Sequence, residues 1–325
     1  MICLVTGGAG FIGSHLALAL VAAGHRVTVV DDLSSGKRTN LPSVKRAVRL
    51  KVVDLSRQNR GIDPLFNGVD WVFHLAGRAD IVPSILYPAD YHRVNVTGTV
   101  NVLESSRRAG VKRFIYAASS TCYGIPDVYP TAETAPARPM FPYALTKYIG
   151  EQYILHWGIV YKLPVVSLRL FNVYGPRAAT SGLYGAVFGT FLAQKLAGKP
   201  LTVVGDGSQR RDFTYVTDVA EAFIRAAKSS VRNEIINIGT GKPQRINTLV
   251  KLIGGSVVHI PKRPGEPDVT CADITKAKKL LDWSPTIPFE KGVAEMLKNI
   301  HLWKDAPVWT PESIKKATHA WFEYL

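Results

Sequence analysis

Tyr143 and Lys147 stand four residues apart in the stretch Tyr143-Ala144-Leu145-Thr146-Lys147. On a helix, residues at i and i+4 share one face, so the ammonium of Lys147 can lie near the phenol of Tyr143. A neighbouring cation favours the phenolate, and we therefore expect Lys147 to lower the pKa of Tyr143 towards working pH. A tyrosine activated in this way can take the proton of a carbinol during its oxidation.

A glycine-rich turn near the start of the chain, Thr6-Gly7-Gly8-Ala9-Gly10-Phe11-Ile12-Gly13, supplies the second half of that chemistry. Between a predicted strand and a predicted helix, such glycines let the backbone turn tightly and bring a helix N-terminus to a pyrophosphate. Asp31 and Asp32 close the next predicted strand about 20 residues further on, where a carboxylate can bind ribose hydroxyls. Because a carboxylate repels a 2′-phosphate, the pattern favours NAD over NADP.

Short β-branched runs alternate with helical patterns over the first half of the chain. This alternation predicts a Rossmann-type, doubly wound α/β fold, in which helices cover both faces of a parallel sheet. We expect strands at residues 1–6, 26–31, 48–54, 71–75, 113–118 and 165–170, and helices at 11–23, 95–109 and 144–160.

Glycine and proline become frequent after about residue 172, and the predicted elements become shorter. We expect residues 1–172 to form the NAD-binding domain, joined by a returning segment of about 212–240 whose strand covers residues 235–238. Residues 173–325 then form mainly a smaller C-terminal lobe that binds the substrate. Thr310 and Pro311 are a suitable N-cap and first residue for a last helix that runs through Trp321.

The composition of the 325 residues, 46% hydrophobic and 20% charged, is typical of a soluble globular protein. No apolar run reaches the ~20 residues that a membrane span needs, and the first predicted strand leaves no room for a signal peptide. Cys3, Cys122 and Cys271 are scattered without metal-ligand spacing. We therefore expect a cytoplasmic protein with no disulfide and no metal.

The formal net charge of +15 is compatible with a nucleic acid, a membrane surface or a small anion as partner. The basic residues are interspersed with acids, and no long basic run with stacking aromatics is present. The sequence thus predicts no nucleic-acid and no membrane partner, and a basic surface that attracts an anionic small molecule.

Several polar segments follow predicted strands, where ligands of a doubly wound sheet bind. Asp54 follows the third strand, Leu75-Ala76-Gly77 the fourth, and Ser119-Ser120-Thr121 the fifth. A hydroxyl at that edge can hydrogen-bond a substrate hydroxyl, although a Ser/Thr turn alone is common in proteins.

Together these segments resemble the extended short-chain dehydrogenase/reductase family, that of the NAD-dependent epimerases and dehydratases, and within it the UDP-hexose 4-epimerases. The resemblance covers essentially the whole chain. Its motifs are Thr6 to Gly13, Asp31-Asp32-Leu33, His74-Leu75-Ala76-Gly77, Asn95-Val96-Thr97-Gly98-Thr99, Ser119-Ser120-Thr121 with Tyr123-Gly124, Tyr143 to Lys147, Arg169-Leu170-Phe171-Asn172-Val173-Tyr174-Gly175-Pro176, Arg211-Asp212-Phe213 and the tail from Trp309 to Leu325.

The resemblance implies a role for each matching residue. Tyr143 would take the proton of the sugar 4-hydroxyl, Lys147 would lower its pKa and hold the nicotinamide ribose, and Ser119 would be the catalytic hydroxyl. The implied cofactor-binding residues are Gly7, Gly10, Phe11, Ile12, Gly13, Asp31, Asp32, Asp54, Leu55, Leu75, Ala76, Gly77, Asn95, Tyr143 and Lys147. The implied substrate-binding residues are Ser120, Thr121, Asn172, Arg211, Arg263, Glu266 and Thr270.

The implied activity is the NAD-dependent interconversion of UDP-glucose and UDP-galactose through a transient 4-keto sugar. Thr270 aligns with the family's gatekeeper beside the sugar C2 substituent, so an N-acetyl group should fit and UDP-GlcNAc and UDP-GalNAc should also interconvert. By analogy with the family, the protein is a homodimer joined through the helices at 95–109 and 144–160.

Two other activities of the family depend on acidic residues that this chain lacks. The family's 4,6-dehydratases carry an Asp-Glu pair where this chain has Ser120 and Thr121, and its UDP-glucuronate decarboxylases carry a glutamate there. Both activities are thereby disfavoured, whereas a UDP-glucuronate 4-epimerase or a net reductase stays open. A non-catalytic NAD-sensing or RNA-binding relative is the alternative of a different class, and the intact Ser119, Tyr143 and Lys147 argue against it.

Overall fold

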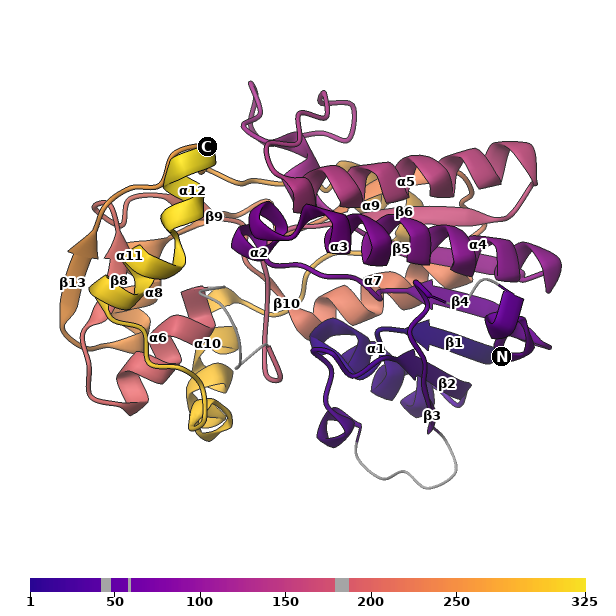
Figure 1. The fold of residues 1–325 in the computed structure, drawn as a ribbon, viewed down its shortest axis with the longest axis horizontal. Helices are drawn as coiled ribbons and strands as arrows, with labels where there is room; N and C mark the ends of the chain where they lie inside the picture. Colours follow the sequence, from indigo (N-terminus) through magenta and orange to yellow (C-terminus); the bar gives the residue numbers. More distant parts are fainter. Residues whose placement is uncertain (42–47, 58–59, 179–186) are drawn as a thin grey trace.

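Seven parallel strands form the central sheet of the computed structural model, which describes residues 1–325 except 42–47, 58–59 and 179–186 (Figure 1). Their order across the sheet is β11-β6-β5-β4-β1-β2-β3. The predicted Rossmann-type fold is confirmed. The strands are β1 (Ile2–Thr6), β2 (Arg26–Asp31), β3 (Val48–Val52), β4 (Trp71–His74), β5 (Arg113–Ser119), β6 (Val165–Leu170) and β11 (Glu234–Ile238).

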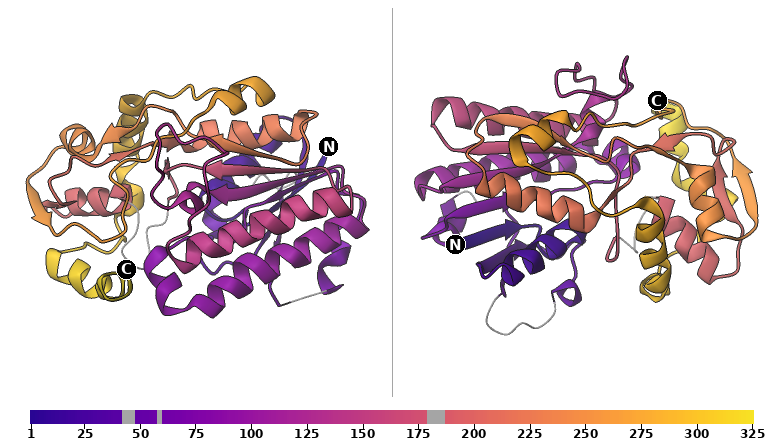
Figure 2. Two further views of the ribbon diagram at one scale, coloured as in Figure 1. Left: turned by 90° about the horizontal axis from the view of Figure 1, so that it is seen from above. Right: turned by 180° about the vertical axis from the view of Figure 1, so that it is seen from behind.

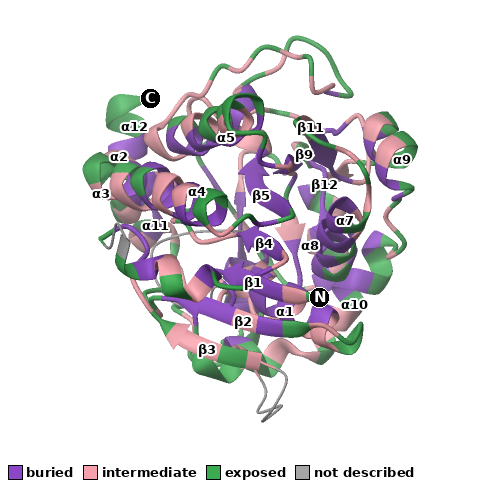
Figure 3. Ribbon diagram, turned by 90° about the vertical axis from the view of Figure 1, so that its right-hand side faces the viewer, coloured by how far each residue is buried: buried purple, intermediate pink, exposed green. Residues whose placement is uncertain are grey.

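The central strands are buried on both faces, as their near-continuous apolar sequences require. Every residue of β4 and β5 is buried, and Figure 3 shows helices on both sides of the sheet. α1 (Phe11–Ala22) and α7 (Val216–Lys228) pack together on one face, whereas α4 (Gly98–Arg108) and α5 (Pro142–Val160) cover the other.

The helix predicted at residues 95–109 differs in the structure. Helical backbone begins earlier, in α3 (Pro88–His92), continues through a π-helical turn at Arg93–Thr97 and ends in α4. Single π turns within α-helices are frequent at functional sites. Here the π turn carries Asn95, whose side chain hydrogen-bonds the backbone of Arg78 in the loop that follows β4.

The C-terminal lobe has a core of its own, dominated by aromatic rings such as those of Tyr174, Phe188, Phe213 and Phe289. It lies beyond the carboxyl ends of the sheet strands, on the left of Figure 1. Its elements include α6 (Val187–Leu196), β8 (Leu201–Val204), α8 (Ile246–Ile253), β13 (Val257–Ile260), α10 (Phe289–Lys298) and a 3-10 turn (Ile300–Trp303).

Short elements complete the chain. The 3-10 turns cover Arg38–Asn40, Arg60–Phe66 and Ser120–Tyr123. Further helices and strands are α2 (Ile81–Leu86), α9 (Thr275–Leu281), β7 (Val173–Tyr174), β9 (Arg210–Arg211), β10 (Thr214–Tyr215) and β12 (Gln244–Arg245). No helix within the described residues is long and apolar enough to cross a bilayer.

The two parts of the chain interleave. The predicted return of the chain to the sheet is confirmed, because β11 pairs in parallel with β6. The sequence did not predict that α9 and Trp283 also join the main core, where the Trp283 indole donates to the carbonyl of Asp218 at 2.9 Å. The division near residue 172 into a nucleotide domain and a substrate domain remains a prediction.

The predicted last helix is divided into α11 (Pro311–Ala317) and α12 (His319–Tyr324). Its start is as expected, because Thr310 and Ser313 form a reciprocal capping box. The interruption falls at Thr318, whose hydroxyl donates to the carbonyl of Ile314 at 2.8 Å. Such side-chain bonds compete with the helical backbone pattern. α12 then packs against α2, and the C-terminus therefore lies beside the main domain (Figure 2).

Candidate active site

A cleft of about 250 Å³ opens at the carboxyl ends of β4, β5 and β6. It brings together residues that the sequence predicted from five separate motifs, namely Ile12, Leu75, Gly77, Ser119, Ser120, Thr121, Tyr143, Lys147 and Asn172. Sequence reasoning missed further lining residues, Arg78, Ala79, Ala117, Ala118, Leu170, Phe171 and Val173. Each of these lies within two residues of a predicted site residue, so closeness in the sequence is the signal that could have identified them.

The backbone of the glycine-rich turn lies so close to other backbone atoms that a side chain at Gly7 or Gly13 would not fit. Gly7 has φ +65°, and a Cβ there would lie 2.7 Å from the backbone nitrogen of Ala76. A Cβ on Gly13 would collide with the carbonyl oxygen of Gly7. Gly10 is the N-cap of α1 and provides no capping side chain, so the first N–H groups of that helix are available to a phosphate. The turn therefore fits the pyrophosphate of a dinucleotide.

Asp31 fastens this turn to the second strand. Its buried carboxylate accepts from the backbone nitrogens of Ala9 and Leu33, each at 2.9 Å. Burial raises the pKa of the Asp31 carboxyl, and these hydrogen bonds oppose the rise. Asp32 is exposed and accepts from the backbone and hydroxyl of Ser34. The two predicted carboxylates thus have different environments.

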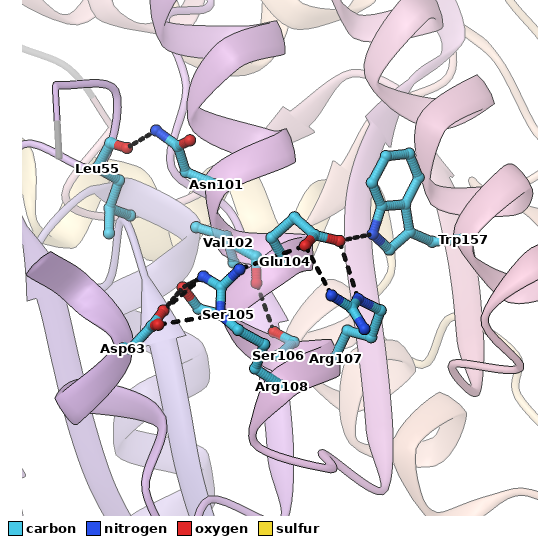
Figure 4. Close-up of polar contacts among 10 residues, drawn as sticks. All are labelled: Leu55, Asp63, Asn101, Val102, Glu104, Ser105, Ser106, Arg107, Arg108 and Trp157. Carbon is cyan, nitrogen blue, oxygen red and sulfur yellow. Dashed lines mark hydrogen bonds and ion pairs between the residues drawn. The ribbon is translucent and has the colours of Figure 1, made fainter. Parts of the chain in front are cut away.

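The next predicted pair, Asp54 and Leu55, is held by neighbouring elements. The carboxylate of Asp54 forms an ion pair with Arg57 at 3.0 Å. The carbonyl of Leu55 accepts from the Asn101 side chain of α4 at 2.9 Å (Figure 4). Both residues lie in the loop that follows β3, at the same edge of the sheet as the cleft.

Asn95 is buried, and its side chain makes hydrogen bonds to two other residues of the protein. Its Oδ1 accepts from the backbone nitrogen of Arg78 at 2.8 Å, and its Nδ2 donates to the Arg78 carbonyl and the Thr146 hydroxyl, each at 3.0 Å. It therefore connects the loop after β4 to the catalytic helix α5. In that loop, a Cβ on Gly77 would stand 3.0 Å from Asn95 Oδ1 and 3.9 Å from Lys147 Nζ.

Tyr143 and Lys147 both line the cleft from α5. The prediction that Lys147 lowers the pKa of Tyr143 towards working pH is wrong for the protein without bound NAD. Burial raises the pKa of the Tyr143 phenol, and a hydrogen bond with Ser119 opposes this rise. The Lys147 ammonium lies over the ring of Tyr116, 4.2 Å from its centroid. Burial lowers the pKa of Lys147 to about 7, and the charge of Glu151 opposes this shift.

A buried ion pair supports α5 one turn beyond Lys147. Arg169 of β6 and Glu151 of α5 approach to 2.6 Å, and both side chains are almost inaccessible to water. Ser167 donates to the same carboxylate at 2.8 Å. The guanidinium of Arg169 also lies over the Tyr123 ring, 4.7 Å from its centroid. Because the pair is fully desolvated, it holds the catalytic helix and β6 in one register.

The predicted hydroxyls meet at the end of β5. Ser119 caps the 3-10 turn, and its Oγ lies 2.8 Å from Oγ1 of Thr121. The hydrogen bond between Ser119 and Tyr143 that affects the tyrosine's pKa places the serine beside the predicted base. The three-residue cluster can therefore share a proton with a carbinol in the cleft.

The predicted anion-binding residues come together in the C-terminal lobe. Arg211 pairs with Oε1 of Glu266 at 2.7 Å, and Arg263 lies 3.7 Å from Oε2. Among the described residues, that second oxygen is buried without a hydrogen-bond donor. The cluster therefore offers two guanidinium groups for phosphates and one acceptor for a hydroxyl.

Thr270 and Asn172 are joined directly, because the threonine hydroxyl donates to the asparagine carbonyl oxygen at 2.8 Å. The backbone nitrogen of Asp212 donates to the same hydroxyl at 3.0 Å. Ser120 and Phe171 line the cleft and also a small pocket of about 20 Å³ that includes Thr270. Thr270 is therefore next to the catalytic cleft.

A Rossmann-type sheet, a glycine turn fit for a dinucleotide and a Tyr143–Lys147 pair beside Ser119 define an enzyme of the short-chain dehydrogenase/reductase class. The chain belongs to the NAD dependent epimerase/dehydratase family, whose model matches residues 3–239. NAD is the cofactor of this family, and bound NAD supplies the hydride acceptor. No three His, Cys, Asp or Glu side chains of the described chain are grouped as a metal site.

Three relatives illustrate the range of this family. The UDP-glucose 4-epimerase of Mycolicibacterium smegmatis is 36% identical over 305 residues, which are 91% of this chain and 97% of the relative. The UDP-N-acetylglucosamine 4-epimerase of Methanobrevibacter ruminantium matches with TM-score 0.86 and 32% identity, covering 93% of this chain and 97% of that one. The UDP-glucuronic acid 4-epimerase of Bacillus cereus, in complex with UDP-glucuronic acid and NAD, matches with TM-score 0.84 and 31% identity, covering 93% and 99%.

Replacing Lys147 with methionine should stabilise the fold in a pH-dependent way. The pKa of Lys147 falls from 10.5 in the unfolded chain to about 7 in the folded protein. The buried ammonium therefore costs most below about pH 7, and the cost vanishes as pH rises towards the unfolded value. Urea unfolding should give Lys147→Met a gain of roughly 1–3 kcal/mol near pH 6 and a much smaller one near pH 10.

The matched control is Lys251→Met, since Lys251 is exposed on α8. Its free energy of unfolding should change little at either pH. An equal gain for Lys147→Met at both pH values would contradict the prediction.

Proposed function

We propose that the protein is a UDP-hexose 4-epimerase that interconverts UDP-glucose with UDP-galactose, and UDP-GlcNAc with UDP-GalNAc. The observation that carries this proposal is the content of the cleft. Ser119 and Tyr143 face it, and its described lining contains no carboxylate. A site with a reversible base and no acid for elimination suits oxidation and reduction at one carbon, without loss of water.

The residues of this chain have distinct tasks in that reaction. Tyr143 takes the proton of the sugar 4-hydroxyl and later returns it, and Ser119 hydrogen-bonds the same oxygen. Lys147 would hold the nicotinamide ribose of bound NAD. Bound NAD would supply a reversible hydride acceptor, so a full cycle would leave no net change in the cofactor.

The nucleotide part of the substrate would bind away from the reacting carbon. Arg211 and Arg263 suit the diphosphate oxygens, and the Glu266 carboxylate oxygen that accepts no hydrogen bond from the described residues suits a uridine ribose hydroxyl. Asn172 borders both this region and the cleft. Binding energy concentrated on the nucleotide leaves the sugar free to turn and present its other face.

A UDP-glucuronate 4-epimerase is the second candidate, and Arg78 favours it. Arg78 lines the cleft, and its guanidinium would supply a partner for the C6 carboxylate of a uronic acid. Arg78 also lies 3.5 Å from Asp90, which competes for that charge. The relative rates with UDP-glucose and UDP-glucuronic acid would separate the two candidates.

We also propose that the enzyme works in the cytoplasm. Its three cysteines are all free and buried, which fits a reducing compartment.

Purified protein should epimerise UDP-glucose without added NAD, because the cofactor is regenerated in each cycle and retained. Tyr143→Phe should lower kcat by ~10²- to 10⁴-fold, since it removes the base. Chromatographic resolution of the epimers is the measurement, with bound NAD quantified in both proteins. Failure of the wild type to form an epimer from UDP-glucose or UDP-GlcNAc, even with NAD supplied, would exclude the proposed function.

Thr270→Tyr should exclude the N-acetyl substrate selectively. A bulky ring beside the small pocket would occupy the space near C2, and kcat/KM for UDP-GlcNAc should fall ~10- to 100-fold relative to UDP-glucose. Thr270→Val is the matched control, because it removes the hydroxyl's hydrogen bonds without adding bulk. If the tyrosine variant kept the wild-type ratio of the two substrates, Thr270 would not be a gatekeeper.

We further propose a homodimer joined through α4 and α5. Glu104 of α4 joins the two helices, because its carboxylate accepts from the Trp157 indole of α5 at 2.9 Å. The same carboxylate pairs with Arg107 within α4 (Figure 4). The outer side of α5 exposes large apolar side chains within an arc of about 120°, Leu145, Tyr153, Ile159 and Val160. That stripe suits a second copy of the chain.

Sedimentation velocity should therefore give the mass of two chains for the wild type. Ile159→Glu combined with Tyr153→Glu should shift the protein towards the monomer, whereas Phe322→Glu, exposed on α12, should not. A wild type that sediments as a monomer would refute the dimer.

A further inference from the structure

Trp321, in the last helix of the chain, is buried at a junction of three separate segments. Trp321 is 6% exposed, whereas its neighbour Phe322 on the same helix is 47% exposed. The contacts of Trp321 identify what it holds.

One set of contacts reaches the arginines that the proposed function assigns to the diphosphate. The Trp321 indole N–H donates to the carbonyl of Pro264 at 2.8 Å. The Arg263 guanidinium carbon stands over the indole, 5.4 Å from the ring centroid. Glu266 then connects Arg263 to Arg211. The indole is thus both an anchor for the backbone of this loop and a platform for its arginine.

The other set of contacts reaches the catalytic helix. The Phe141 ring lies 6.3 Å from that of Trp321 and is stacked on Tyr143, with centroids 6.4 Å apart and an interplanar angle of 10°. Phe141 is also the N-cap residue of α5. α12 itself packs on α2, just beyond the loop that carries Gly77 and Arg78 (Figure 1). The C-terminal helix therefore joins the arginine loop to the wall of the cleft.

We propose that Trp321 is a positioning residue that holds Arg263 ready for the diphosphate of the substrate, and so makes the C-terminal helix part of the substrate site. The inference rests on the proposed function, because it assumes a UDP-linked ligand. An arginine side chain loses much rotamer freedom when it is fixed on an anion. If the indole already restricts the guanidinium, less of that cost remains at binding, and affinity rises without a contact between Trp321 and the ligand.

The experiment is calorimetric titration of the NAD-loaded enzyme with UDP. Trp321→Ala should raise the Kd of UDP ~5- to 30-fold, and Trp321→Phe, which keeps a ring but loses the N–H donor, should have a smaller effect. Phe322→Ala, on the same helix, is the matched control and should bind as the wild type does. With UDP-glucose, KM should rise in the same order, while kcat and bound NAD stay near wild-type values.

A double-mutant cycle separates positioning from general support of the fold. In an Arg263→Ala background, Trp321→Phe should have little further effect on the Kd of UDP, because the side chain it positions is gone. An undiminished effect in that background, or a Kd for Trp321→Phe and Trp321→Ala equal to that of the control, would overturn the inference. A wild type that does not bind UDP at all would instead overturn the proposed function, and this inference with it.

Discussion

The buried ion pair of Glu151 and Arg169 is the constraint on which the active site depends. Charges removed from water are tolerated only when each is paired and hydrogen-bonded, and breaking such a pair typically costs about 3–5 kcal/mol. Here Ser167 completes the carboxylate's partners and Tyr123 covers the guanidinium. The helix that carries Tyr143 and Lys147 cannot slide along the sheet without separating the two charges. The geometry of the catalytic pair therefore follows from an interaction outside the cleft.

The same pair influences the electrostatics of the cleft. Lys147 is buried over Tyr116, and burial lowers its pKa to about 7 while Glu151 opposes this fall. Burial also raises the pKa of Tyr143. In the protein alone, both groups are thereby moved towards their neutral forms.

The substrate side is assembled from segments that lie far apart in the sequence. Asp212 is fully buried, and its carboxylate accepts from the backbone nitrogens of Gly241 and Ala272. It thereby fixes Arg211 next to the loop that carries Thr270. Trp321 adds the end of the chain to this assembly through Pro264. Each contact is individually small, but together they hold Arg211 and Arg263 in one cluster with Glu266.

The sequence by itself determined the local features of this protein. Alternation of apolar runs predicted the sheet strands, and the glycine spacing predicted a turn whose Gly7 and Gly13 leave no space for a Cβ. The spacing of Tyr143 and Lys147 placed both on one helix lining the cleft. These predictions succeeded because they depend on backbone geometry over a few residues. The family resemblance implied Arg211, Arg263 and Glu266 as substrate-binding residues, but it did not predict the ion pairs among them.

Only the tertiary structure decided the environment of those residues. The direction of the Tyr143 pKa depends on burial, which four residues of sequence do not specify. The use of Asn95 by the loop at Arg78, and the contact of Trp321 with a carbonyl 57 residues away, arise from chain segments that meet only on folding. Desolvation and long-range packing are properties of the assembled core. For that reason, the sequence could name the residues that line the candidate site but could not assign their charges or their supports.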